Sequence, residues 1–214
     1  MPRWTPKEVW KDQDVFLIGG GSSLKDFDWN LLKSELTIGC NTAFTLGKDV
    51  CKICIFGDAK WFHKYSSELE NYGGVVFTNA PQLVNTKIRW LWTMMRRSYG
   101  LHFDALGWND NTGASAINLA LLLGAKRIFL LGFDMQLDDT KRNPNWHNRI
   151  LGKTTEGVYS KFLKGFDRVV KDLKAKFPNR EVINVNSNSK LAVFPMISPD
   201  VFWKERMVGK NNEE

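Results

Sequence analysis

Candidate binding and catalytic residues lie where short hydrophobic runs of the sequence end in small or polar residues. The first such run, VFLIGGGSSL, places Gly19, Gly20, Gly21 and Ser23 directly after apolar residues. Glycines remove the side-chain barrier around a backbone, so the N–H groups of this turn can approach an anion such as a phosphate. Because the turn lacks both the GxGxxG pattern and the lysine of a P-loop, a plain tight turn is the alternative.

Polar side chains also follow later hydrophobic runs. Asn41 and Thr42 follow LTIGC, Asp58 follows ICIFG, and Asp134 ends KRIFLLGFD. The last run, EVINV, is followed by the polar residues 186–189. Ligands of an open parallel sheet collect beyond the carboxyl ends of its strands, so we expect these residues to converge with the glycine turn on one site.

A second turn of this kind, within NDNTGASAINLALLLGAK, begins a helix of small residues. Thr112 and Gly113 would lie at its N-terminus, where free N–H groups and the helix dipole favour an anion. The alternative is an ordinary helix cap, made by Asn111 or Thr112.

His147, in NPNWHNRIL, is the candidate catalytic residue. It lies in a loop after a strand that is expected to reach the site, and the pKa of histidine suits general acid or base chemistry. A structural histidine is the alternative interpretation.

Two other patterns carry less specific chemistry. The D-x-D at 26–28 falls where a short helix begins, so we interpret it as a helix cap and expect no metal site. The tryptophans and arginines of residues 90–97 could stack on a base or could pack as an irregular hydrophobic segment.

Strand and helix patterns alternate along the chain. The strand-like runs are 14–20, 36–41, 53–58, 75–79, 126–134 and 181–185, and the helical patterns are 27–33, 61–72, 112–123 and 159–177. This alternation is typical of crossover units that build a parallel sheet. We therefore expect an α/β fold: a Rossmann-like, mostly parallel sheet with helices on both faces, plus an irregular insertion.

The length of 214 residues, with 43% hydrophobic residues, is enough for one core. We expect one nucleotide-binding domain over residues 1–203. Within it, residues 80–110 would form a variable insertion or lid, and residues 204–214 would form a frayed tail.

The composition of the chain limits the kinds of partner that we expect. The formal net charge of +7 favours anionic partners such as nucleotides, nucleic acid or acidic glycans without choosing among them.

The three cysteines have no disulfide framework and are interpreted as reduced, buried thiols. No run approaches the roughly 20 apolar residues of a membrane helix, and the N-terminus lacks a signal-peptide core, so we expect a cytoplasmic protein.

Several motifs together resemble a known family. IGGGSSLKDFD, GCNTAF, NTGASAINLALLLGAKRIFLLGFDM, a histidine and VINVNSNSKLAVFP follow in the order found in family 42 bacterial sialyltransferases. GDAKWF and NWHN resemble related bacteriophage and prophage proteins, which would place the chain in a bacterial host. The wider superfamily includes 6-hydroxymethylpterin pyrophosphokinases and motility accessory factors. The likeness covers roughly residues 14–198.

The resemblance implies a nucleotide in the cleft and a histidine that acts on an acceptor hydroxyl. His147 would be the general base. The predicted nucleotide-contacting residues are Gly19, Gly20, Gly21, Ser23, Asn41, Thr42, Asp58, Thr112, Gly113 and Asp134.

Three functions are compatible with these residues. The first is a metal-independent, inverting glycosyltransferase without a cofactor, whose nucleotide-sugar donor is CMP-linked and whose positive cleft stabilises the departing phosphate. Its acceptor would be a glycan, a small molecule or DNA. The second is a Mg²⁺-dependent enzyme that transfers pyrophosphate or a nucleotidyl group and uses Asp58 and Asp134. The third is a non-catalytic nucleotide-binding phage protein. A homo-oligomer is compatible with all three.

Overall fold

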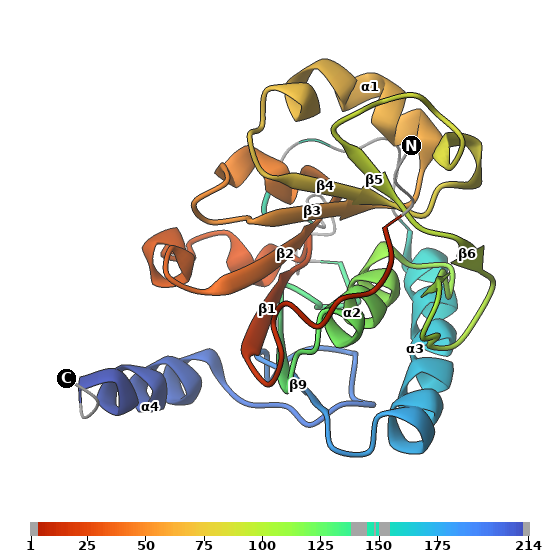
Figure 1. Cartoon of the computed structure of the whole chain (residues 1–214). Coiled ribbons are helices and arrows are strands. Elements are labelled where there is room, and N and C mark those ends of the chain that lie inside the picture. Colours follow the sequence, from red (N-terminus) through yellow and green to blue (C-terminus); the bar gives the residue numbers. More distant parts are fainter. Residues whose placement is uncertain (1–3, 138–144, 148, 150–154, 212–214) are drawn as a thin grey trace.

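The structure, a computed structural model of the chain, describes residues 4–137, 145–147, 149 and 155–211 (Figure 1). Most of the polar loop around His147, and residues 212–214 of the expected tail, lie outside the described residues. Among the described helices, none is long and apolar enough to cross a membrane.

A seven-stranded sheet forms the centre of the molecule, and every strand pair in it is parallel. Its order is β5-β4-β3-β2-β1-β8-β9. The strands are β1 (Asp14–Ile18), β2 (Leu36–Cys40), β3 (Ile53–Phe56), β4 (Val75–Thr78), β5 (Leu91–Thr93), β8 (Arg127–Leu131) and β9 (Glu181–Asn184). The α/β, Rossmann-like fold expected from the sequence is therefore confirmed.

Helices cover both faces of this sheet (Figure 1). Val15 and Leu17 of β1 point into the core under α2 (Thr112–Leu122) and α3 (Glu156–Lys176). Phe16 and Ile18 point into the opposite core. That second core lies under α1 (Ala59–Glu70), α4 (Pro199–Asn211) and the short helices η1 (Ser22–Leu24), η2 (Trp29–Leu32) and η3 (Asn41–Leu46). The alternation along β1 follows from the two-residue repeat of a strand.

Helix α2 is buried on all sides because its residues are small or apolar. Ala114, Ala116, Ile117 and Ala120 have no exposed surface. A helix that is apolar all round belongs in a core. The helix packs directly against the central strands β1, β2 and β3.

Residues 80–110, to which the sequence assigned no elements, contain η4 (Pro81–Leu83) and the edge strand β5. They also contain β6 (Arg96–Arg97) and β7 (Leu106–Gly107), which pair with each other. Asn118 of α2 accepts from the N–H groups of His102 and Gly107 at 3.1 and 3.0 Å and donates to the carbonyl of His102 at 2.9 Å. A buried side chain thus fixes this segment to the core helix.

Helix α4 covers most of the segment that the sequence analysis expected to be frayed. Phe202 is buried against Phe16, and the Trp203 ring stacks on Phe16 at 5.7 Å. Arg206 pairs with Asp14 at 2.9 Å and with the buried Glu35 at 2.7 Å. These contacts join residues far apart in the sequence, and they hold a helix that the local sequence alone does not mark.

Candidate functional site

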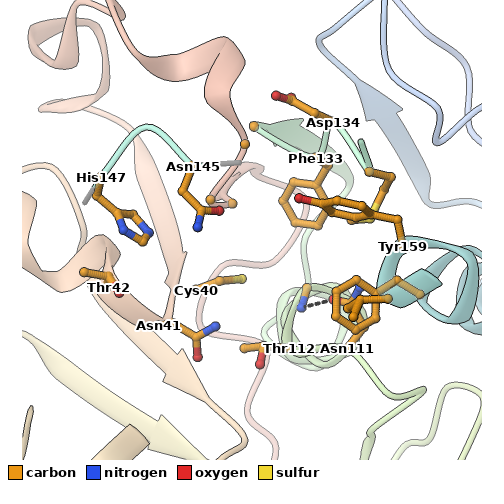
Figure 2. Close-up of a pocket in the computed structure, with 18 of the residues that line it drawn as sticks. Cys40, Asn41, Thr42, Asn111, Thr112, Phe133, Asp134, Asn145, His147 and Tyr159 are labelled. Carbon is orange, nitrogen blue, oxygen red and sulfur yellow. Dashed lines mark hydrogen bonds between the residues drawn. The ribbon is translucent and has the colours of Figure 1, made fainter. Parts of the chain in front are cut away.

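A pocket of about 520 Å³ lies beyond the carboxyl ends of the central strands (Figure 2). Strands β1 and β8 are neighbours, but the chain leaves β1 toward β2 and leaves β8 toward β9. Open parallel sheets bind ligands at such a switch point. Of the residues predicted from the sequence, the pocket is lined by Gly19, Gly20, Gly21, Asn41, Thr42, Asp58, Thr112, Gly113, Asp134 and His147.

The N–H groups of the glycine turn are largely used inside the protein. Gly19 N–H donates to the carbonyl of Leu131, and Gly21 N–H donates to the carbonyl of Gly132, both at 2.8 Å. Ser23 N–H donates to Asp134 Oδ2, also at 2.8 Å. The expectation that these N–H groups face an anion is wrong, because they bind the strand and loop of β8 instead.

Close packing explains why two of these residues are glycines. A Cβ atom on Gly19 would lie 2.5 Å from the carbonyl oxygen of Gly132, and one on Gly21 would lie 2.5 Å from Asp134 Oδ2. The turn therefore rests directly on the loop that follows β8. Gly20 faces the other way, since its nearest neighbours would be the side chains of Asn145 and His147.

Asp134 anchors the turn from within the protein and is 4% exposed. Its carboxylate accepts from Ser23 Oγ at 2.6 Å and from Asn186 Nδ2 at 2.9 Å. Ser189 Oγ donates to the carbonyl of Phe133 at 2.7 Å. Ser23 is therefore not among the residues that line the pocket, and the polar residues after β9 support Asp134 instead of facing a ligand.

Several residues at the strand ends adopt the left-handed backbone conformation. Asn41 has φ 52°, Asp110 has φ 57° and Met135 has φ 53°, and all three line the pocket. Non-glycine residues in this region are uncommon and cluster at functional sites. Asn41 directly follows β2 and begins η3, so this backbone turn brings its side chain to the pocket wall (Figure 2).

The start of α2 forms the wall opposite His147 (Figure 2). Asn111 caps the helix, since its Oδ1 accepts from Gly113 N–H at 2.6 Å. The ordinary-cap alternative is thus confirmed for Asn111. Thr112 and Gly113 also line the pocket, so the positive end of the helix dipole still faces it.

His147 is half-buried on the side of the pocket that faces Gly20. Burial, with a smaller contribution from the Arg149 charge, lowers the pKa of His147 to about 4. The imidazole is therefore neutral at pH 7. Arg149 N–H donates to His147 Nδ1 at 3.3 Å, and this long hydrogen bond favours the tautomer that carries its proton on Nε2.

The described residues that line the pocket do not by themselves make the positive cleft expected from the sequence. Among the described lining residues, Asp58, Asp110 and Asp134 supply carboxylates and Arg149 supplies a cation. Asp110 pairs with Lys161 of α3 at 3.3 Å, and Arg149 pairs with a carboxylate of α1. No group of three or more His, Cys, Asp or Glu side chains within the described ranges is placed to hold a metal ion.

Two charged side chains that the sequence suggested as ligand contacts, Asp58 and Arg96, make hydrogen bonds that stabilise the fold. Asp58 caps α1 by accepting from Lys60 N–H at 2.7 Å. Arg96 donates from Nε to the carbonyl of Asn79 at 2.9 Å and lies over the ring of Trp108, which lines the pocket, at 4.0 Å. Burial lowers the pKa of the Arg96 guanidinium. Arg96 thus packs behind the pocket wall.

Some residues that line the pocket are not predicted from the sequence, because their position depends on tertiary contacts. Asn145, Asp110, Cys40 and Phe162 line the pocket beside the predicted set. One local signal existed: Asn145 lies two residues before His147, and an extended segment places such residues on one side. Tyr159 of α3 also lines the pocket.

Comparison with known proteins finds this fold among solved structures. No protein-family model matches the sequence, and no curated protein matches it. Two structures of the sialyltransferase CstII from Campylobacter jejuni are similar at 16% sequence identity, over 88% of this chain and 86% of theirs. One is a complex with the substrate analogue CMP-3FNeuAc (TM-score 0.51), and the other a complex with the substrate analogue cytidine-5'-monophosphate (TM-score 0.53). The chain therefore shares its overall fold with this sialyltransferase.

Proposed function

We propose that this chain is a glycosyltransferase-like enzyme that binds a nucleotide sugar, with CMP as the nucleotide, in the pocket at the switch point. The observation that carries the proposal is the position of the pocket between the glycine turn after β1, the loop after β8 and the N-terminus of α2. The shared fold supports it, because CstII, whose solved structures hold CMP and a CMP-sugar analogue, aligns over 88% of the chain.

The chemistry assigned to His147 is removal of the proton from an acceptor hydroxyl. Its pKa of about 4 keeps the ring neutral at pH 7, as a general base requires. To act through the nitrogen that faces Gly20, the ring must carry its proton on Nδ1, so the hydrogen bond from Arg149 N–H has to open on substrate binding. The attacking oxygen then displaces the nucleotide with inversion, and its proton passes to His147 Nε2.

The dipole of α2 is the described feature best placed to stabilise a departing phosphate. Thr112 and Gly113 lie at its positive end and line the pocket. Tyr159 of α3 lines the same pocket and is a second candidate for a contact with the phosphate. In this proposal no metal takes part in the transfer.

The Mg²⁺-dependent alternative is less well supported by the geometry. It would use Asp58 and Asp134 to hold a shared cation. Asp58 is committed to capping α1, and Asp134 accepts from Ser23 and Asn186 inside the glycine turn. The glycosyltransferase therefore remains the function that we propose.

The test is turnover of CMP-linked sugars, measured as release of CMP in the presence of EDTA. His147→Ala should abolish release while CMP still binds, because the histidine moves a proton but does not make the pocket. His63→Ala is the matched control, since His63 is an exposed histidine on α1 outside the pocket lining. Unchanged turnover in His147→Ala would remove the assigned base, and failure of the wild-type protein to bind CMP would remove the proposed nucleotide.

A further inference from the structure

A short segment, residues 145–147, is clamped onto the glycine turn. Trp146 N–H donates to the carbonyl of Gly20 at 3.0 Å, and Trp146 Nε1 donates to the carbonyl of Gly19 at 2.8 Å. Gly21 and Asn145 form an antiparallel bridge. Trp146 also packs against Trp29 of η2, with ring centroids 5.1 Å apart. The backbone and the indole of one residue therefore hold the segment against the turn.

The extended geometry of this segment places its two polar side chains together. Residues i and i+2 of an extended chain point to the same side, so Asn145 and His147 face the pocket while Trp146 faces the protein. Both line the pocket and lie side by side above Thr42 and Asn41 (Figure 2). The tryptophan therefore sets the position of two potential ligand contacts at once.

Gly20 leaves the space that Asn145 uses. A Cβ atom on Gly20 would lie 2.9 Å from Asn145 Oδ1 and 3.8 Å from His147 Nε2. The carboxamide of Asn145 thus lies over the middle of the turn, where a residue with a side chain would place that side chain. In this chain the polar group above the turn comes from a different loop.

The turn itself offers little to a nucleotide, because the N–H groups of Gly19, Gly21 and Ser23 bind the loop of β8. A carboxamide carries two donor hydrogens and an acceptor oxygen, and it can serve both the hydroxyls of a ribose and the oxygens of a phosphate. Building on the proposed function, we propose that Asn145 binds the sugar-phosphate part of the nucleotide, and that Trp146 is the positioning residue that presents Asn145 and His147 to it.

Calorimetric titration with CMP and with cytidine tests the contact of Asn145. Asn145→Ala should weaken CMP binding about 10-fold, the loss expected for one hydrogen bond to a ligand. Asn145→Asp has nearly the same shape but adds a negative charge, so it should weaken CMP binding further than Asn145→Ala does while cytidine binding falls less. Asn188→Ala is the matched control, because Asn188 is exposed beyond β9 and does not line the pocket.

The outcomes separate this inference from the proposed function. If the wild-type protein binds neither CMP nor cytidine, the proposed nucleotide fails. If the wild-type protein binds CMP and Asn145→Ala binds it equally well, the role of Asn145 is overturned. Gly20→Ala adds an independent check: it should displace the carboxamide and weaken CMP binding while the free energy of unfolding hardly changes, since a side chain tip can move aside.

The role of Trp146 is tested by Trp146→Phe, which keeps an aromatic ring but loses the hydrogen bond from Nε1 to Gly19. The readout is the pKa of His147, followed by NMR of its ring protons. We expect this pKa to rise from about 4 toward the ordinary value of 6.5, because a displaced ring is better solvated. Trp92→Phe, in β5 and packed against the core on the opposite face of the sheet, should leave it unchanged. A pKa unaffected by Trp146→Phe would overturn the positioning role.

Discussion

Single residues at this site are constrained by contacts on the side away from the pocket. Asp134 accepts hydrogen bonds from Ser23 and Asn186, and this carboxylate is the reason why position 21 has no room for a side chain. A buried charge needs such a set of donors to be tolerated. The turn after β1 is therefore shaped by a carboxylate from the loop after β8 as much as by any ligand.

Gly21→Ala should lower the free energy of unfolding by about 1–3 kcal/mol, because its Cβ would overlap the carboxylate of Asp134. The measurement is urea denaturation followed by tryptophan fluorescence. Gly209→Ala is the control: no atom would lie within 4 Å of its Cβ, and alanine favours the helix by up to about 1 kcal/mol. Equal stability of the two variants would contradict the close approach of the turn and the β8 loop.

The lowered pKa of His147 predicts an unusual pH dependence. The base must be neutral to accept a proton, and a pKa of about 4 keeps it neutral well below pH 6. The value of kcat/KM, which reports the free enzyme, should therefore stay level from pH 8 to about pH 5 and fall below that. The decrease of kcat should begin at a higher pH than the decrease of kcat/KM, because a bound phosphate favours the charged imidazolium. A limb of kcat/KM near 6.5 would contradict the buried histidine.

At the scale of elements, α2 organises the site from the core. Its N-terminus reaches the pocket, and its buried side chains hold residues 98–109 beside it. Ser115 Oγ donates to the carbonyl of Gly107 at 2.9 Å, next to the bonds made by Asn118. The segment after β6 thus depends on amide and hydroxyl groups of a helix that is otherwise apolar.

Asn118→Ala should lower the free energy of unfolding by about 3 kcal/mol, because it leaves the buried N–H of Gly107 and the partly buried N–H and carbonyl of His102 without these partners. Hydrogen–deuterium exchange should rise in the peptide over residues 98–108 before it rises elsewhere. Asn188→Ala, an exposed asparagine, is the control and should change neither. If the wild-type segment exchanged as fast as an open lid, the fixed arrangement would be contradicted.

At the scale of the whole molecule, the parallel sheet gathers loops from distant parts of the chain. The glycine turn, η3 and the loop after β8 meet because β1, β2 and β8 end at one edge of the sheet, and the start of α2 lies beside them in the pocket wall. A ligand in that pocket contacts both sides of the switch point. It therefore binds the folded state alone, and its binding energy adds to the stability of the whole fold.

CMP at 100 times its Kd should stabilise the protein by about 2.7 kcal/mol, which raises Tm by roughly 5–11 °C for a chain of this size. The measurement is differential scanning fluorimetry with CMP, UMP, GDP and ATP, each with and without Mg²⁺. A response to CMP that does not depend on Mg²⁺ fits the proposed function. A response confined to ATP with Mg²⁺ would favour nucleotidyl or pyrophosphate transfer instead.

The sequence by itself determined the architecture of this protein. The apolar runs and the glycines between them predict β1, β2, β3, β4, β8 and β9 to within a few residues, because a strand buried on both faces needs a continuous apolar run. The rule that parallel strands present their carboxyl ends at one edge then places most of the predicted residues around one pocket. Local pattern suffices for these features, since each depends on residues close together in the chain.

Only the tertiary structure decided what each of those residues does. The sequence could not show that Gly21 is small because of Asp134, that Ser23 faces this carboxylate, or that Trp146 presents Asn145 and His147 above Gly20. Helix α4 and the order of residues 98–109 also rest on distant partners, Arg206 with Glu35 and Asn118 with Gly107. The physical reason is common to all: hydrogen bonds and packing between segments far apart in the chain are set by the three-dimensional approach of backbones, which no local pattern encodes.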